Sequence, residues 1–264
     1  MQRKLHGQMS ESFLIAGILS VSGGLQDAYT YMYRGKVFAN AQTGNIVLLA
    51  QNLVDRNWQA ALRYFSPLLF FALGVAMAEC IRMRYQKAQK IHWRQLVLVM
   101  EIVLLFAVGF FPNDIDLLAN AMVSFACAMQ VQAFRKVNGY AFASTMCIGN
   151  LRSGMESLCA YGKTKDKKIL QKSGYYFGII FLFAIGAALG GHMIKYIGAK
   201  TIWISCLILL ISFLCMFIKE EKKEHPEIVQ EEREIRENLQ NIRKEAKDVE
   251  HILEDDFRSQ IEKK

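Results

Sequence analysis

The chain has 264 residues, of which 53% are hydrophobic and 21% charged. Residues 219–264 carry 11 of the 32 Lys and Arg and 15 of the 24 Asp and Glu, so residues 1–218 retain 21 basic and nine acidic residues. A soluble domain cannot hide so apolar a body with so few charges. Composition therefore excludes a disordered protein, a secreted disulfide scaffold and an ordinary soluble enzyme, and it indicates a helical membrane protein.

Apolar stretches of about the length that crosses a bilayer recur along the body. Six are clear, at about residues 13–33, 64–81, 96–111, 117–134, 175–196 and 202–218. Two further segments, 37–54 and 142–161, are mildly apolar and rich in Asn, Gln, Thr and Ser. Whether these two polar segments span the membrane or re-enter it decides the architecture.

The two polar segments resemble each other, which indicates an internal repeat. A shift of 105 residues, changing to 112 after a basic insertion near Lys163, relates the two halves of the body. The matched pairs are Asp27 with Gln132, Asn40 with Thr145, Gly44 with Gly149, Asn45 with Asn150, Gly74 with Gly186 and Ala78 with Gly190. The sequence therefore predicts two homologous membrane repeats, residues 11–111 and 112–218.

The distribution of basic residues favours six spans over eight. With six spans and both termini cytoplasmic, 15 Lys and Arg lie inside and six outside, whereas eight spans largely remove this bias. Three spans per repeat is an odd number, so the second repeat is predicted to be inverted relative to the first. In this predicted topology, residues 1–10 form a cytoplasmic N-terminus and residues 219–264 form a cytoplasmic helical tail.

In the favoured interpretation the two polar segments re-enter from opposite faces, each as an extended leg that leads into a short helix. Asn40 or Thr43 would cap the first short helix, and Ser144 or Thr145 the second. Irregular backbone at membrane depth is tolerated only against protein or water, so these segments would line a polar cavity, where helix N-termini favour an anion. The alternative is two ordinary polar helices that span the membrane inside the bundle.

This interpretation predicts a solute site near the middle of the membrane. Its candidate residues are Asp27, Asn40, Gln42, Thr43, Asn45, Thr145, Asn150 and Arg152. An intramembrane carboxylate is costly, so Asp27 is expected either to bind a proton or cation or to serve as a buried acceptor for the leg. Arg152 either contacts an anion or, as the favoured reading, pairs with Glu156 four residues later.

Glu101 is the other carboxylate inside a predicted span. It lies about a turn into the third span, from where a long side chain can reach the interface. We expect it to snorkel there or to pair with Arg94.

A resemblance to a known family rests on residues 23–45. The pattern GG-x-x-DA, from Gly23 to Ala28, followed by G-x-VFAN-x-x-TGN, from Gly35 to Asn45, resembles the YoaK family of bacterial membrane proteins. The resemblance covers roughly residues 10–218 and omits the charged tail. It implies a bacterial inner-membrane location, and no established activity comes with it.

The tail shows a heptad pattern. Ile228, Ile235, Ile242 and Val249 recur every seven residues among charged positions, which predicts a coiled coil or a long amphipathic helix. Self-association or binding of a protein partner through residues 225–261 is favoured over folding back onto the basic inner face.

Two functions follow as hypotheses. The first is a permease or channel-like transporter of a small polar or anionic solute. The second is a non-transporting membrane scaffold or sensor that acts through its tail. The sequence contains no P-loop, dinucleotide fingerprint, nucleophile elbow or zinc-protease motif, and we predict no enzyme activity, cofactor or metal. The basic residues cluster between apolar stretches, so the lipid bilayer and not nucleic acid is the expected partner.

Overall fold

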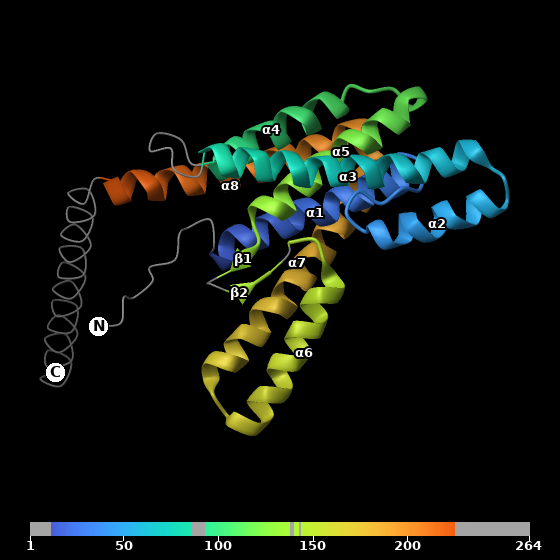
Figure 1. Cartoon of the computed structure of the whole chain (residues 1–264). Helices are drawn as coiled ribbons and strands as arrows, with labels where there is room; N and C mark the ends of the chain where they lie inside the picture. The colour runs from blue at the N-terminus through green and yellow to red at the C-terminus, as the bar shows by residue number, and fades with distance from the viewer. Residues whose placement is uncertain (1–11, 86–92, 138–139, 143, 225–264) are drawn as a thin grey trace, which may run out of the picture. The chain divides into compact units, whose positions relative to one another are not determined.

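The computed structural model of the chain describes residues 12–85, 93–137, 140–142 and 144–224 (Figure 1). Almost all of these residues are helical, as predicted. The α-helices are α1 (Phe13–Tyr33), α2 (Gln42–Val54), α3 (Trp58–Tyr85), α4 (Trp93–Val108), α5 (Asp116–Ala133), α6 (Cys147–Thr164), α7 (Lys167–Ile197) and α8 (Ile202–Glu224). Short 3₁₀ turns precede α5 (Asn113–Ile115) and α8 (Gly198–Thr201), and an unpredicted antiparallel pair of two-residue strands, β1 (Lys136–Val137) and β2 (Tyr140–Ala141), lies between α5 and α6.

The helices match the predicted segments. The six apolar stretches fall on α1, α3, α4, α5, α7 and α8, while α2 and α6 fall on the two polar segments. Within the described residues, three helical stretches are long and apolar enough to cross a membrane: Trp58–Tyr85, Asn113–Ala133 and Lys167–Met216. The last stretch contains both α7 and α8. A helical membrane protein is therefore supported, and the count of six spans stays a prediction.

The predicted caps of the two short helices are wrong. α2 begins after Ala41 and α6 after Met146, and neither residue caps its helix with a side-chain hydrogen bond. Thr43 lies inside α2. The physical reason at Asn40, Ser144 and Thr145 is competition, because these side chains bond or pack against α1 and α5 instead. Side-chain caps do occur elsewhere, as at α1, where the Ser12 hydroxyl accepts from the backbone N–H of Ile15 at 3.4 Å.

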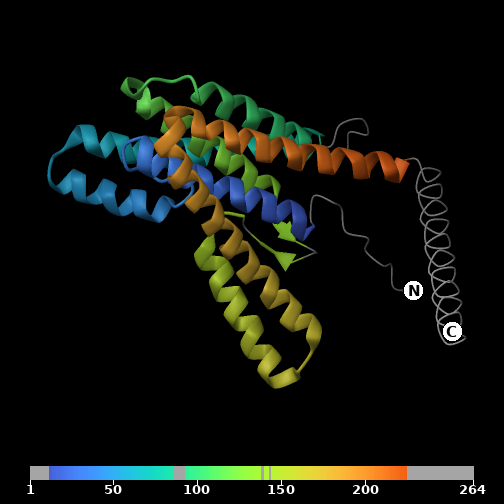
Figure 2. The same cartoon turned by 180° about the vertical axis from the view of Figure 1, so that it is seen from behind.

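Glycines lie at the points where the long helices cross. α1 packs most extensively on α7, and α3 on α5 (Figures 1 and 2). A Cβ added to Gly186 on α7 would overlap the backbone of Val21, and one added to Gly74 on α3 would overlap the carbonyl of Phe125 on α5. Gly186 and Gly74 therefore serve close packing of helices within the chain.

The short helices lie beside the N-terminal parts of their successors, α2 on α3 and α6 on α7 (Figures 1 and 2). Large apolar side chains on these helices are exposed, among them Val54 and Ile148, each 82% exposed. Such a surface fits contact with lipid better than contact with water. The buried core lies among α1, α4, α5 and α8.

Candidate functional site

The first irregular leg is tied to α1 by a carboxylate and an amide. The Oδ1 of Asp27 accepts a hydrogen bond from the backbone N–H of Asn40 at 2.7 Å. The Nδ2 of Asn40 donates to the carbonyl of Gly23 at 3.4 Å. Gly23 and Asp27 are one helical turn apart and share a face of α1. Asp27 therefore fulfils the predicted role of buried acceptor for this leg.

Asn45 fixes the shape of the leg from the first turn of α2. Its Oδ1 accepts from the backbone N–H of Phe38 at 3.2 Å, and its Nδ2 donates to the carbonyl of Phe38 at 2.7 Å. Gln42 assists, accepting from the Asn45 amide at 2.9 Å and donating to the carbonyl of Ala39 at 2.7 Å. Asn45 is fully buried. These two predicted site residues therefore position the leg.

The second leg reaches the same face of α1 from the other repeat. Gln130 on α5 donates to the hydroxyl of Ser144 at 3.1 Å and to the carbonyl of Leu19 at 3.4 Å. The methyl group of Thr145 lies against Gly23, where it would overlap an added Cβ. Asn40 and Thr145, which the repeat matches to each other, thus both contact Gly23. We call the surroundings of Gly23, made by Asp27, Asn40, Gln130 and Thr145, the leg junction.

Replacing Asn45 with Ala is expected to loosen the first leg without unfolding the body. The variant loses both hydrogen bonds to the Phe38 backbone, each worth about 1 kcal/mol net. Amide hydrogen exchange across residues 37–41 is expected to rise roughly 10- to 100-fold, since about 1.4 kcal/mol is a factor of ten. Asn52→Ala is the matched control, because the side chain of Asn52 donates within α2, to the carbonyl of Leu48. Equal exchange in the two variants would contradict this role.

The remaining predicted site residues differ in their burial. Asn150 is buried near the start of α6, at the position that matches Asn45, whereas Thr43 and Arg152 are exposed. The expected pairing of Arg152 with Glu156 is wrong, because both side chains are exposed and form no ion pair within the described part of the chain. The structure therefore gathers Asp27, Asn40, Gln42, Asn45 and Thr145, and leaves out Thr43 and Arg152.

A second polar cluster, which the sequence did not predict, lies on the neighbouring face of α1. Gln26 Nε2 lies 3.0 to 3.1 Å from Ser22 Oγ, Ser205 Oγ on α8 and Glu101 Oε1 on α4. The thiol of Cys127 on α5 donates to Gln26 Oε1 at 2.6 Å, and the two serine hydroxyls are 2.5 Å apart. Figure 1 shows α1 lying among these helices. We call these five residues the Glu101 cluster.

The expectation that Glu101 reaches the membrane interface or pairs with Arg94 is wrong, and the Arg94 Nε donates to the carbonyl of Ala133 at 2.9 Å. The Glu101 side chain is 0% exposed, because α4 turns it toward α1 and α8. The available signal in the sequence was the pair Ser22 and Gln26, two polar residues four positions apart in an apolar span. Their partner on another helix could not be read from the sequence.

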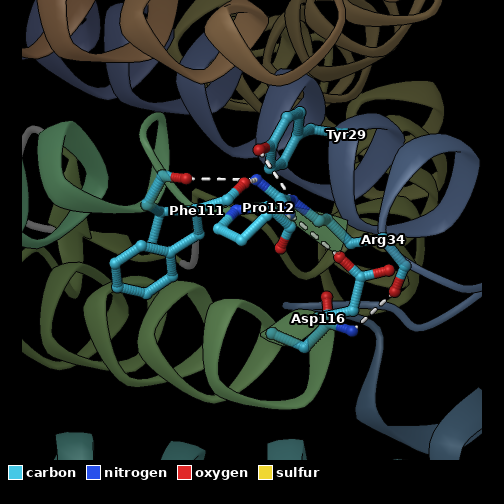
Figure 3. A network of polar contacts seen from close by, with 7 residues as sticks. Tyr29, Arg34, Phe111, Pro112 and Asp116 are labelled. Carbon is cyan, nitrogen blue, oxygen red and sulfur yellow. Dashed lines mark hydrogen bonds and ion pairs between the residues drawn. The ribbon is translucent and has the colours of Figure 1, made fainter. Parts of the chain in front are cut away.

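Arg34, at the end of α1, is fully buried and joins three elements (Figure 3). Its Nε donates to the Tyr29 hydroxyl at 2.9 Å, and its Nη1 forms an ion pair with Asp116 at 2.9 Å. The Asn120 amide of α5 donates to the Arg34 carbonyl at 2.7 Å. The other guanidinium bonds go to backbone carbonyls at the end of α4 and beyond it, those of Val108, Phe111 and Pro112, at 2.9 to 3.2 Å.

The Arg34 guanidinium therefore uses all five of its N–H donors. A buried charge is stable only when it is paired and hydrogen-bonded, and this arrangement meets both conditions. The carbonyls at the C-terminus of α4 also attract a positive charge. The sequence analysis counted Arg34 among the six basic residues outside the membrane, because its partners other than Tyr29 lie more than 70 positions away along the chain.

Helical stretches long enough to cross a bilayer, an apolar exposed surface and buried polar clusters define a helical membrane protein. The family model described as "Protein of unknown function (DUF1275)" matches residues 15–215, and the chain belongs to this family. It is 25% identical over 185 residues to the UPF0700 transmembrane protein YoaK of Bacillus subtilis (strain 168), covering 66% of this chain and 80% of that protein. The predicted membership of the YoaK family and a membrane location are confirmed. No solved structure matches the chain.

Proposed function

We propose that the chain is a permease or channel-like transporter that moves a small polar or anionic solute through the leg junction. The observation that carries this proposal is the meeting of two non-helical legs at Gly23. Within a membrane, irregular backbone persists only where it is buried in protein or lines a polar path. In many secondary transporters such broken segments form the substrate site at the interface of two repeats.

The order of elements supports two repeats. α2 begins at Gln42 and α6 at Cys147, a separation that equals the repeat shift of 105 residues. The crossings exchange partners between the halves, α1 with α7 and α3 with α5. An exchange of this kind is expected for two related halves that pack about a pseudo-two-fold axis.

The Arg34 contacts favour six spans, and hence inverted repeats. They bring the end of α1 beside Phe111, Pro112 and Asp116, between α4 and α5. With α2 re-entrant, these two ends lie on the same membrane face. With α2 as a spanning helix, the connection from α4 to α5 would lie on the opposite face from Arg34, which contradicts the contact.

The leg junction presents both kinds of hydrogen-bonding group to a solute. The buried amide oxygens of Asn40 and Gln130 have no hydrogen-bond partner among the described residues, so they suit solute donors. The N-termini of α2 and α6, which follow the legs without side-chain caps, suit acceptors or negative charge. A small solute of either type fits this combination.

Flux through the full-length chain tests the proposal. We would reconstitute it in liposomes and follow permeation of urea, formate and nitrate by light scattering. At least one solute is expected to permeate faster than in empty vesicles. Asn40→Ala is expected to lose most of this flux, because Asn40 provides the amide at the junction, whereas Asn52→Ala retains it. A panel in which every solute behaves as in empty vesicles, or equal flux in both variants, would contradict transport through this site.

The scaffold hypothesis makes the opposite prediction. It places the activity in residues 225–261, whose heptad pattern lies outside the described residues. The scaffold hypothesis is favoured if the chain shows no flux and if its effect in cells is unchanged by Asn40→Ala.

A further inference from the structure

The Glu101 cluster contains an ionisable group, the Glu101 carboxyl group, that has no counter-ion among the described residues. Glu101 is 0% exposed, and its Oε1 accepts one hydrogen bond, from Gln26 Nε2 at 3.1 Å. Its Oε2 is buried and has no hydrogen-bond partner among the described residues. An ionised carboxylate in such surroundings is strongly unfavourable, because one neutral donor replaces the hydration of a full charge.

No cationic side chain faces this carboxyl group from the helices packed around it, within the described residues. α1 presents Gln26 and Ser22, α5 presents Cys127, and α8 presents Ser205 with Cys206 beside it. Of these groups, the two thiols are titratable. The acidic group next along α1, Asp27, bonds to the leg instead.

α3 supplies no counter-ion to Glu101 either. Near its C-terminal end, Glu79 and Arg82 pair with each other, Glu79 Oε2 accepts from Gln132 at 2.7 Å, and Arg84 is exposed. A metal ion would need further strong ligands, and the described residues contain no group of three or more His, Cys, Asp or Glu that could hold one. The smallest species that neutralises Glu101 is a proton.

We propose that Glu101 is an exchangeable proton-binding site inside the membrane body. The site has a direct connection to the leg junction. Gln26, which also bonds to Ser22, holds Glu101 on one face of α1, while Gly23 and Asp27 hold the legs on the adjacent face. Loss of the proton would draw Gln26 and Ser205 toward the new charge and shift α1 against α4 and α8. Proton binding at Glu101 does not depend on the proposed transport function. Only the naming of this proton as the coupling ion of transport rests on that function.

Infrared spectroscopy of the purified full-length chain in lipid nanodiscs tests the proton directly. At neutral pH a protonated carboxyl group gives a C=O stretch that a carboxylate lacks. The wild-type chain is expected to show this band, and transfer to D₂O is expected to lower its frequency as the proton exchanges. E101Q is expected to lose the band, whereas E156Q, which alters an exposed glutamate on α6, retains it. D27N separates any contribution of Asp27.

A second variant keeps the test independent of the folding of E101Q. Gln26→Leu removes the donor on Oε1 and is expected to raise the frequency of the Glu101 band while preserving its area. A band that persists in E101Q, that does not move in Gln26→Leu, or that ignores D₂O would overturn the proposal, as would the absence of a band from the wild-type chain. The readout requires no flux, so failure of the proton site and failure of the transport proposal are distinguishable.

Discussion

Replacing Arg34 with Ala is expected to be among the most destabilising single changes in the chain. It removes a fully buried charge together with five hydrogen bonds, and it leaves Asp116 and the carbonyls of Val108, Phe111 and Pro112 without their donor. Breaking one partner of a buried ion pair typically costs about 3–5 kcal/mol. Thermal or denaturant unfolding of the full chain in lipid nanodiscs measures the loss.

Two further variants define the cause. Arg34→Lys is expected to lose most of the stability that Arg34→Ala loses, because an ammonium group cannot reproduce the five-donor geometry of guanidinium. Arg63→Ala, at an exposed arginine on α3, is the control and is expected to change stability by no more than about 0.5 kcal/mol. If Arg34→Ala unfolded at the same point as Arg63→Ala, the assignment of Arg34 as a structural anchor would be wrong.

Replacing Gly186 with Ala is expected to separate α1 from α7. The added Cβ would overlap the backbone carbonyl group of Val21, which cannot move aside as the end of a side chain can. Overpacking of this kind costs about 1–3 kcal/mol and occasionally more. The leg junction shares α1, so solute flux is expected to fall together with the unfolding temperature.

Gly174→Ala is the matched control on the same helix. Nothing lies within 4 Å of a Cβ at Gly174, which is exposed. Alanine favours a helix over glycine by about 1 kcal/mol, so this variant is expected to be neutral or slightly more stable. A similar effect of the two substitutions would mean that helix propensity, and not the crossing of α1 and α7, determines the result.

The sequence was sufficient to predict the helices, and the relation between the two halves stays a prediction. Long apolar stretches mark α1, α3, α5, α7 and α8 because spanning helices require a minimum apolar length. The two polar segments, residues 37–54 and 142–161, contain α2 and most of α6. The motif around Asp27, Asn40 and Asn45 was likewise correctly predicted to surround an irregular leg.

The predictions that were wrong concern contacts between segments that are distant in the sequence. The predicted caps were wrong because Asn40 and Thr145 contact α1, and a competing partner on another helix leaves no local signal. Glu101 was misplaced because helical periodicity does not say which neighbour covers a polar residue. Arg34 looked like a topology signal, and the approach of α4 and α5 supplies four of the five partners of its guanidinium.

In the proposed six-span topology the two repeats enter the membrane from opposite faces, and their legs meet at Gly23. Asn57 lies between α2 and α3, Thr164 is the last residue of α6, and both residues are exposed. Single cysteines at these positions, in a chain whose six native cysteines are replaced, report sidedness through an impermeant thiol reagent in intact cells. The account predicts labelling at position 57 and protection at position 164. Labelling at both positions, or at neither while both react in opened cells, would place the repeats in parallel and contradict it.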